Sequence, residues 1–275
     1  MRKILNYINP FHLFTSLYQH RYLLGQITKR DIQSKYRGSL LGSVWAFINP
    51  LVLLVIYTYV FSVIFQAKWG YSTSSNHYEF ALALFCGLIS FNIFSETVNK
   101  STGIILSNPN YVKKVVFPLE ILPVSALLSS MFQAMINFLL LMIGMLFYFQ
   151  EVHLTTLLFP ILLIPLVLLT TGMALFLSSL GVYVRDIGQI VGVLVTILFY
   201  VTPIFYPASV VPEFFQEIMF ANPLSTIIEA IRQAILWGNQ PDWASWLQTT
   251  GITLLIFLFG YAWFKLTRKG FADVI

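Results

Sequence analysis

Charged residues are scarce in this sequence. Only 10% of the chain is Asp, Glu, Lys or Arg, whereas 57% is apolar, and an ordinary soluble domain carries about 25% charged residues. So few charges cannot cover a water-exposed surface, which excludes a soluble protein. Several apolar runs are also long enough to cross a bilayer, because about 20 apolar residues span roughly 30 Å of hydrocarbon. The sequence therefore predicts an all-α integral membrane protein.

Cysteine and metal-ligand patterns are also nearly absent. Cys86 is the single cysteine, so neither an intramolecular disulfide nor a thiolate metal site can form. The four histidines show no ligand spacing, so we expect no metal site; they are His12, His20, His77 and His153. The residues before Pro10 lack the apolar segment of a signal peptide, so no cleavage is expected there.

Sequence motifs for catalysis are missing as well. The chain contains no Gly-x-Ser-x-Gly, no His-Glu-x-x-His and no paired carboxylates near a histidine. It also lacks a Walker A sequence, since no glycine precedes Lys-Ser or Lys-Thr at the required spacing. We therefore expect no catalytic residues, no cofactor bound by this chain and no nucleic-acid partner. If ATP drives its function, ATP and Mg²⁺ must be bound by a partner subunit.

Six apolar runs bounded by charge, proline or glycine define six predicted transmembrane helices. These runs are Val44–Phe65, Phe80–Val98, Leu122–Phe149, Leu154–Leu180, Ile187–Phe205 and Trp246–Leu266. We expect a single domain over residues 1–275. Within it, 1–43 form a cytoplasmic or interfacial segment, 44–266 the six-span bundle and 267–275 a cytoplasmic tail.

The basic residues predict the orientation of this bundle. If six spans alternate, 14 of the 16 Lys and Arg residues fall on one side, and only Lys68 and Arg232 fall on the other. Glu79, Glu151 and Asp242 are among the acidic residues on that second side. Both termini are therefore predicted to be cytoplasmic, and the charge distribution supports six spans.

Two further segments read as helices that do not span. Phe11 to Tyr36 mixes aromatic and basic residues at helical spacing, which predicts a cytoplasmic amphipathic helix in the headgroup layer. A merely solvated basic tail is the alternative. Tyr206 to Asp242 is apolar but broken by prolines, which predicts short re-entrant or interfacial outer helices at Glu213–Phe220 and Leu224–Trp237. These lie between spans five and six.

The predicted spans carry almost no ionisable side chains. Carriers coupled to protons or sodium usually place acids or bases at membrane depth, so ion-coupled transport has little support here. Glu96 lies four residues before Lys100, and an ion pair along one helix would account for both charges.

Aromatic residues are abundant in the spans. Tyr57, Phe61 and Phe65 share one face of span one. The others are Phe85, Phe91 and Phe94 in span two, and Phe199, Tyr200, Phe205 and Tyr206 near the end of span five. Aromatic faces stack on sugar rings and tolerate sliding, which suits a translocation path for glycans. Bundle packing and an interfacial aromatic belt are the alternative.

Two pairs of glycines have the spacing that lets membrane helices approach each other closely. They are Gly38 with Gly42 and Gly188 with Gly192. The pattern is common in membrane helices, so it predicts little by itself.

Four stretches of the sequence carry a resemblance to a known family. They are Arg30-Asp31-Ile32-Gln33-Ser34-Lys35-Tyr36-Arg37-Gly38-Ser39-Leu40-Leu41-Gly42 with Trp45 and Asn49-Pro50-Leu51; Asn108-Pro109-Asn110-Tyr111-Val112-Lys113-Lys114-Val115-Val116-Phe117-Pro118-Leu119-Glu120 with Pro123; Tyr183-Val184-Arg185-Asp186-Ile187; and Asn222-Pro223-Leu224 with Glu229 and Arg232. Together they resemble the permeases of ABC type-2 exporters, and most of all those for polysaccharide, O-antigen and teichoic acid. The resemblance covers nearly the whole chain in order.

The resemblance implies a half-transporter in the bacterial inner membrane. Its partners would be a second copy of itself, two copies of a cytoplasmic ABC ATPase subunit, and membrane lipid. The implied substrate is a lipid-linked polysaccharide on undecaprenyl diphosphate, moved outward. Contact with the ATPase is expected at two cytoplasmic breaks, which hold Lys100, Asn108, Tyr111, Arg185 and Asp186.

Basic residues around the first amphipathic helix and before span three would then meet the diphosphate. They are Lys29, Arg30, Lys35, Arg37, Lys113 and Lys114. The alternative is that these charges only anchor the topology. Two other functions also stay open, namely a type-2 ABC permease for drugs or simple lipids and a membrane carrier or enzyme outside the ABC class.

Overall fold

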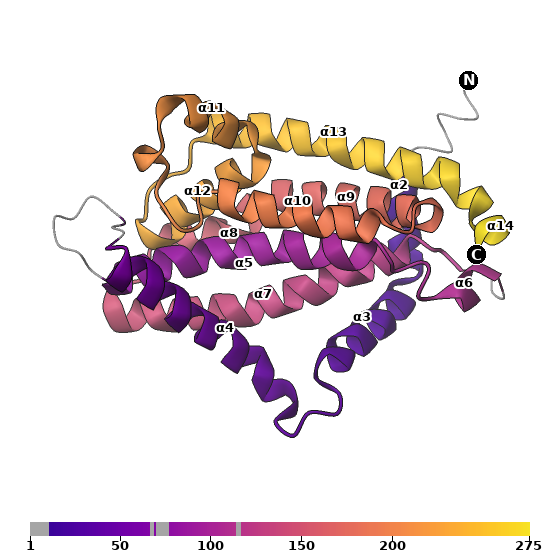
Figure 1. The fold of residues 1–275 in the computed structure, drawn as a ribbon, viewed down its shortest axis with the longest axis horizontal. Coiled ribbons are helices and arrows are strands. Elements are labelled where there is room, and N and C mark those ends of the chain that lie inside the picture. The colour runs from indigo at the N-terminus through magenta and orange to yellow at the C-terminus, as the bar shows by residue number, and fades with distance from the viewer. Residues whose placement is uncertain (1–10, 67–68, 70–76, 114–116) are drawn as a thin grey trace.

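The computed structural model describes residues 11–66, 69, 77–113 and 117–275, which form helices joined by turns and contain no strand in these ranges. Figure 1 shows the long helices running side by side along the long axis of the molecule. Five helical stretches are long and apolar enough to cross a membrane: Gly42–Ile64, His77–Ser101, Ile121–Tyr148, Leu154–Tyr183 and Trp243–Val274. The predicted all-helical class is confirmed.

The helices that build these stretches begin and end within a few residues of the predicted spans. The first stretch is η1 (Gly42–Val44), α4 (Trp45–Tyr57) and the π-helical turn η2 (Thr58–Ile64), and the next two are α5 (His77–Ser101) and α7 (Ile121–Tyr148). The fourth comprises η3 (Leu154–Leu158), α8 (Phe159–Leu162) and α9 (Ile164–Tyr183). The last comprises α13 (Trp243–Thr267), η5 (Arg268–Gly270) and α14 (Phe271–Val274), and the short α6 (Pro109–Lys113) precedes α7.

The predicted fifth span is shorter than expected. Helix α10 covers Ile187–Val201 and has 15 residues, whereas the sequence predicted continuation to Phe205. Thr202 is already extended, because Pro203 disfavours the helical conformation in the residue before it. This helix is shorter than the roughly 20 residues that cross a bilayer. A bundle of six spans therefore stays a prediction.

Helix α5 lies at the centre of the bundle. It is apolar nearly all round and packs against α7, α9, α10 and the later helix α12, as expected for a helix buried on every side. The stretch Gly42–Ile64 is the opposite case, because only 6% of its apolar window is buried. Apolar side chains on α4, α10 and α13 face outward, and such a surface has to be covered by lipid or by protein.

Glycines determine how closely α9 and α13 approach. A Cβ atom on Gly260 would collide with the backbone of Gly172, and one on Gly181 would collide with the carbonyl of Thr102. Of the glycine pairs identified from the sequence, Gly38 and Gly42 bring no helices together within the described chain, since a Cβ on either would meet nothing within 4 Å.

Gly38 and Gly42 instead shape the turn that precedes α4. Their φ angles are +87° and +51°, a left-handed conformation that glycine adopts without the steric cost of a Cβ atom. In the second pair, Gly188 does approach another segment closely, because a Cβ built on it would lie 3.3 Å from the side chain of Thr102, whereas one on Gly192 would meet nothing within 4 Å.

The predicted N-terminal amphipathic helix is two helices. α2 covers Phe11–Gln19 and α3 covers Arg21–Tyr36, and they part at His20, whose ring nitrogen Nδ1 lies 2.9 Å from the carbonyl of Ser16. α2 buries Leu13, whereas α3 packs along α7 and buries Ile27 and Asp31. The buried residues Leu13 and Ile27 belong to the same hydrophobic cluster.

The short helices predicted after α10 are present. η4 (Ala208–Val210), α11 (Glu213–Ala221) and α12 (Pro223–Leu236) follow one another, and Asn222 caps α12 by accepting a hydrogen bond from the Leu224 N–H at 3.1 Å. α12 packs on α5, α8 and α13 and is mostly buried. Their position relative to a membrane stays a prediction.

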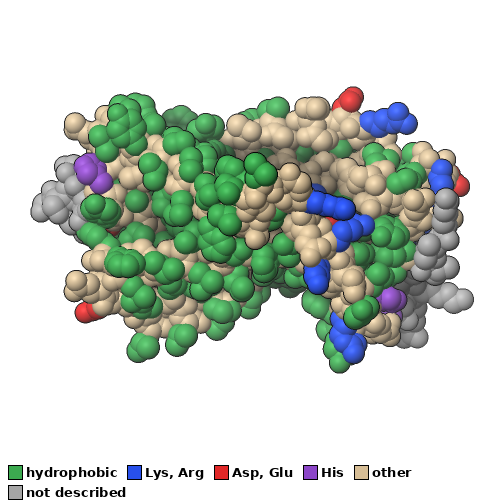
Figure 2. All heavy atoms as spheres, turned by 90° about the horizontal axis from the view of Figure 1, so that it is seen from below, with side chains coloured by type: hydrophobic (Ala, Val, Ile, Leu, Met, Phe, Trp, Pro, Cys, Tyr) green, Lys and Arg blue, Asp and Glu red, His purple; other side chains and the backbone are tan. Residues whose placement is uncertain are grey.

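The two ends of the bundle differ in charge. Because α5, α7, α9, α10 and α13 alternate in direction (Figure 1), one end holds Lys100, Lys113, Arg185 and Arg268, and we call it the basic end. The opposite end carries α11 and the start of α13, with Asp242. In Figure 2, Lys and Arg gather in one half of the visible face, while hydrophobic side chains dominate the other. Which end faces the cytoplasm stays a prediction.

Candidate functional site

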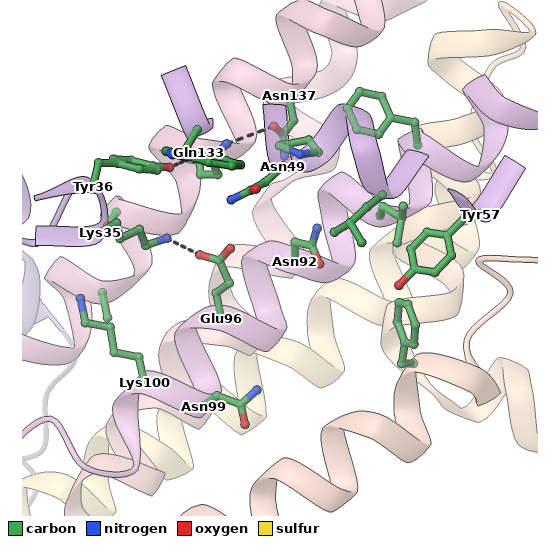
Figure 3. A pocket seen from close by; sticks show the side chains of 18 residues that line it. Lys35, Tyr36, Asn49, Tyr57, Asn92, Glu96, Asn99, Lys100, Gln133 and Asn137 are labelled. Atoms are coloured by element: carbon green, nitrogen blue, oxygen red, sulfur yellow. Dashed lines mark hydrogen bonds and ion pairs between the residues drawn. The ribbon is translucent and has the colours of Figure 1, made fainter. Parts of the chain in front are cut away.

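A cavity of about 630 Å³ lies between α3, α4, α5, α7 and α10. We call it the central cavity, and Figure 3 shows the side chains that line it. It exists because the turn at Gly38 and Gly42 lies away from the bundle and α4 approaches the bundle only toward its end, so that α4 meets α5 and α7 over only part of its length. Its lining changes along its length from charged, to amide-bearing, to aromatic.

Two ion pairs join α3 to α5 at the charged part. Lys35 Nζ lies 2.5 Å from Glu96 Oε2, and Lys100 Nζ lies 2.7 Å from Asp31 Oδ2. The pairing of Glu96 with Lys100 along one helix is therefore wrong. Packing of α3 against α7 brings two of its own charges to α5, and each finds an opposite charge there. The four charges sum to zero, so this part of the cavity is polar without a net charge.

Amide side chains line the middle of the cavity. The Tyr36 hydroxyl donates to Gln133 Oε1 at 2.6 Å, and Gln133 Nε2 donates to the Ala46 carbonyl at 2.8 Å and to Asn137 Oδ1 at 3.2 Å. The buried Ser129 hydroxyl also lines the cavity and has no hydrogen-bond partner in the described part of the chain.

These amides were missed by the reading of the sequence, although their spacing carried a signal. Asn92, Glu96 and Asn99 recur at i, i+4 and i+7 on α5, and Gln133 and Asn137 at i and i+4 on α7. Such spacing places polar groups on one face of a helix. Polar groups within an apolar span are costly unless they face a cavity or one another.

The predicted aromatic residues gather at the far part of the cavity. Phe205 is the centre of this group, with ring centroids of Phe61 at 4.5 Å, Phe199 at 4.9 Å and Tyr57 at 5.4 Å. Phe91 lies 5.1 Å from Phe199. Phe65, Phe94 and Tyr200 each contact one of these rings. The Tyr206 hydroxyl donates a hydrogen bond to the Tyr200 carbonyl.

Only part of this aromatic group faces the cavity. Tyr57, Phe85 and Phe199 line it, whereas Phe91, Phe94 and Phe205 are buried and are not among its lining residues. Packing within the bundle therefore accounts for the buried rings, as the alternative interpretation held. A role of the lining rings in contacting a substrate stays a prediction.

The six basic residues expected at a phosphate group do not form one cluster. Lys35 lies in the central cavity, while Arg30 and Arg37 line a second cavity between α3, α4 and α7. Lys29 is exposed on α3 and Lys113 is exposed on α6. Lys114 lies outside the described residues.

The residues expected to contact an ATPase all lie at the basic end. Lys100 is held by Asp31 as described, and Asn108 Nδ2 donates to the Ile104 carbonyl at 2.8 Å. The Tyr111 ring stacks on Phe117 with centroids 4.5 Å apart. Arg185 and Asp186 are exposed in the turn between α9 and α10. Their contact with another subunit stays a prediction.

A buried carboxylate ties the basic end together. Glu120, which is 2% exposed, accepts from Lys265 at 3.1 Å and from Arg268 at 3.0 Å, and Arg268 also donates to the Phe117 carbonyl. Burial raises the pKa of Glu120, but a backbone hydrogen bond and the two cations outweigh burial and hold the pKa below its ordinary value. The loop before α7 is thereby fixed to the end of α13.

Arg232 is the centre of a second buried cluster of polar contacts, near the opposite end of the bundle. Its guanidinium is fully buried and donates to the carbonyls of Ala83 and Pro203, each at 3.1 Å, and to Glu229 at 3.0 Å. It also lies 4.2 Å above the ring of Trp69. Each of its three nitrogens donates to a protein group, so Arg232 has a structural role.

An apolar helical bundle with an apolar outer surface is the architecture of an integral membrane protein, and this one encloses a polar cavity. Residues 22–236 match the ABC-2 type transporter family, and the chain belongs to that family. It is 27% identical to the O-antigen export system permease protein RfbA of Myxococcus xanthus, covering 96% of this chain and 99% of the relative.

Two further relatives are similar over most of their length. RfbA of Klebsiella pneumoniae, also an O-antigen export system permease protein, is 28% identical over 92% of this chain and 95% of its own. The polysialic acid transport protein KpsM of Escherichia coli is 26% identical over 87% of this chain and 91% of its own.

Proposed function

We propose that this chain is the membrane-spanning subunit of an ATP-driven exporter that moves a polysaccharide on an undecaprenyl diphosphate carrier outward across the bacterial inner membrane. The observation that carries the proposal is the central cavity, in which amides and aromatic rings follow one another along the bundle. The family and the polysaccharide-exporting relatives support the same substrate class.

Sugar chemistry fits the lining of the central cavity. Carboxamides such as Asn92 and Gln133 both donate and accept hydrogen bonds, so they pair with hydroxyl groups in either sense. Rings such as Tyr57 and Phe199 offer apolar faces to the C–H side of a sugar. Neither contact demands one fixed register, which suits a polymer that has to slide.

Two kinds of partner complete the proposed transporter. A second copy of the chain covers the outward apolar faces of α4 and α10, which flank the central cavity. Two ATPase subunits dock at the basic end, where the turn holding Arg185 and Asp186 is exposed. This chain has no Walker A sequence, so ATP hydrolysis belongs to those subunits, and both chain termini lie on their side of the membrane.

The test is ATP-driven export by the chain and its ATPase in proteoliposomes, with lipid-linked polysaccharide on the outer face as the readout. Asn92→Leu removes a polar group from the cavity at similar size. Losing one or two hydrogen bonds of about 1 kcal/mol each predicts a fall in export of about tenfold. Gln26→Leu, an amide on the exposed side of α3, is the matched control and should leave export unchanged.

Two results would contradict the proposal. The first is a wild-type complex that hydrolyses ATP but moves no polysaccharide. The second is an Asn92→Leu complex that exports at the wild-type rate. Hydrolysis of ATP by the purified chain alone would refute the division of labour between the subunits.

A further inference from the structure

A second cavity lies on the other side of α3 from the central cavity. It has a volume of about 760 Å³ and occupies the wedge between α3, the start of α4 and α7. We call it the wedge cavity. Its walls are apolar, with Phe47 from α4 and Phe132 and Met135 from α7, and two arginines on α3, Arg30 and Arg37, line it as well.

We propose that the wedge cavity binds the lipid anchor of the transported polymer, a long-chain polyprenyl diphosphate. The diphosphate lies against Arg37 and Arg30, and the first isoprene units lie against the apolar walls. This inference rests on the proposed function and assigns the anchor to a different site from the sugars. The guanidinium group of arginine suits a phosphate because it presents paired donors in a planar fork.

The available positive charge lies at the wedge and not in the central cavity. Arg37 is exposed and makes no hydrogen bond or ion pair with the described residues. Arg30 has only long contacts, each 3.4 Å, to Asp31 and to the Tyr111 hydroxyl. Lys35 and Lys100, by contrast, are held by carboxylates at 2.5 and 2.7 Å. An anionic group that approaches the wedge therefore finds Arg37 unpaired and Arg30 only weakly held, whereas Lys35 and Lys100 are already paired with carboxylates.

The turn at the tip of the wedge indicates that the cavity opens to lipid. Leu40 and Leu41 lie at this tip, and their exposed fractions are 106% and 49%. Exposed leucines beside arginines are typical of a segment at the boundary between headgroups and acyl chains. A polyprenyl chain in the same leaflet can enter the wedge from the side without leaving the bilayer.

A chain of hydrogen bonds separates the wedge cavity from the central cavity. Tyr36 lines both cavities. Its hydroxyl donates to Gln133, and Gln133 donates to the Ala46 carbonyl, so α3, α7 and α4 are tied together at this partition. An anchor held at Arg37 therefore lies one side chain away from the amides of the central cavity.

Photo-crosslinking from inside the wedge tests this assignment. Phe47 is replaced by p-benzoylphenylalanine in the complex with its ATPase, in nanodiscs of phosphatidylethanolamine and phosphatidylglycerol, with undecaprenyl diphosphate added as the probe. Mass spectrometry then identifies the captured lipid. The matched control position is Phe259, which lines an apolar groove between α9 and α13 whose other lining residues include Met173 and Phe176 but no cation.

We expect saturable capture of undecaprenyl diphosphate from Phe47, in preference to the more abundant phosphatidylglycerol, and only bulk phospholipid from Phe259. Arg37→Gln should weaken capture at Phe47 about tenfold or more, because a charge-assisted contact is lost. Arg37→Lys keeps the charge without the fork and should give an intermediate value. Arg21→Gln, a basic residue outside the wedge, should change nothing.

Several outcomes would overturn the inference. Capture of phosphatidylglycerol as readily as undecaprenyl diphosphate would make the wedge a general lipid groove, and capture insensitive to Arg37→Gln would remove the headgroup contact. Because capture needs no ATP, it is separate from export. A complex that exports polysaccharide but captures no undecaprenyl diphosphate at Phe47 refutes the wedge assignment alone, whereas a complex that exports nothing refutes the proposed function.

Discussion

Replacing Arg232 by methionine tests how the end of the bundle opposite the basic end is held together. Methionine is unbranched, apolar and reaches about as far as the Nε atom of arginine, so the substitution removes the charge and the donors and leaves part of the volume filled. The carbonyls of Ala83 and Pro203 then lose their donor in a buried place. Trp69 loses the guanidinium above its ring.

The size of the effect follows from these contacts. Removing one partner of a buried charged group costs about 3–5 kcal/mol. The lower end of that range applies, because the Glu229 side chain is 32% exposed and keeps a hydrogen bond from Gln233 at 2.8 Å. A loss of about 3 kcal/mol lowers Tm by about 6–12 °C for a chain somewhat shorter than this one.

Thermal unfolding of the purified protein in detergent, followed by loss of the monodisperse size-exclusion peak, measures this shift. Arg21→Met is the control, because Arg21 is exposed and the nearby residue Tyr18 supplies both of its contacts in the described part of the chain, the carbonyl at 3.1 Å and the ring centroid at 4.9 Å. Its Tm should stay within about 2 °C of wild type, as for most surface substitutions. A Tm of Arg232→Met equal to that of the control would refute the structural role of the buried guanidinium.

Two further predictions concern the basic end and the orientation. Glu120→Gln should lower Tm at neutral pH, and its difference from wild type should shrink as pH falls below 4.5; the folded pKa is depressed, so this stabilisation is present above the unfolded pKa and lost on acidification. A difference in Tm that stays constant with pH would contradict the ionised pairing. In a Cys86→Ala background, Gln240→Cys should react with an impermeant thiol reagent on intact cells and Ser34→Cys should not, and the reverse pattern would overturn the orientation.

Local features of the sequence were sufficient to predict most helices. The length and ends of an apolar run can be read directly from the sequence. For this reason α5, α7 and α13 begin and end close to the predicted residues. The short helix α12 was predictable for the same reason, with Pro223 at its first turn and Asn222 as its cap. Only the end of the fifth predicted span was wrong, because the apolar run was followed past Pro203 to Phe205. The effect of Pro203 on the residue before it is also local.

Contacts between distant segments could not be predicted in the same way. Glu96 was assigned to Lys100 because that is the nearest opposite charge along the helix, but Lys35, 61 positions away in sequence, bonds to it. The close approach of α9 and α13 depends on two glycines, Gly172 and Gly260, whose partners lie on different helices. Spacing within one helix says which residues share a face but not which helix that face meets.

The polar stripe on α5 could have been read more fully. Asn92, Glu96 and Asn99 share one face of a span that is otherwise apolar, and this pattern predicts either a cavity or a polar contact with another helix. The choice between the two needs the position of α4, which depends on the backbone conformation of Gly38 and Gly42. The spacing of residues in the sequence is enough to predict the polar face of α5. Whether that face lines a cavity depends on the turn before α4, which sets where α4 lies.

Neutral pairing inside the central cavity is also what a sliding polymer requires. A path conducts only if each contact is favourable enough to admit the substrate and weak enough to release it. Unpaired Lys35 and Lys100 would hold an anionic anchor inside the path, and Glu96 and Asp31 remove that trap by neutralising them. The cations that can bind strongly, Arg30 and Arg37, instead line the wedge cavity. On the proposed function, strong binding of the anchor and weak binding of the sugars are therefore assigned to opposite sides of α3.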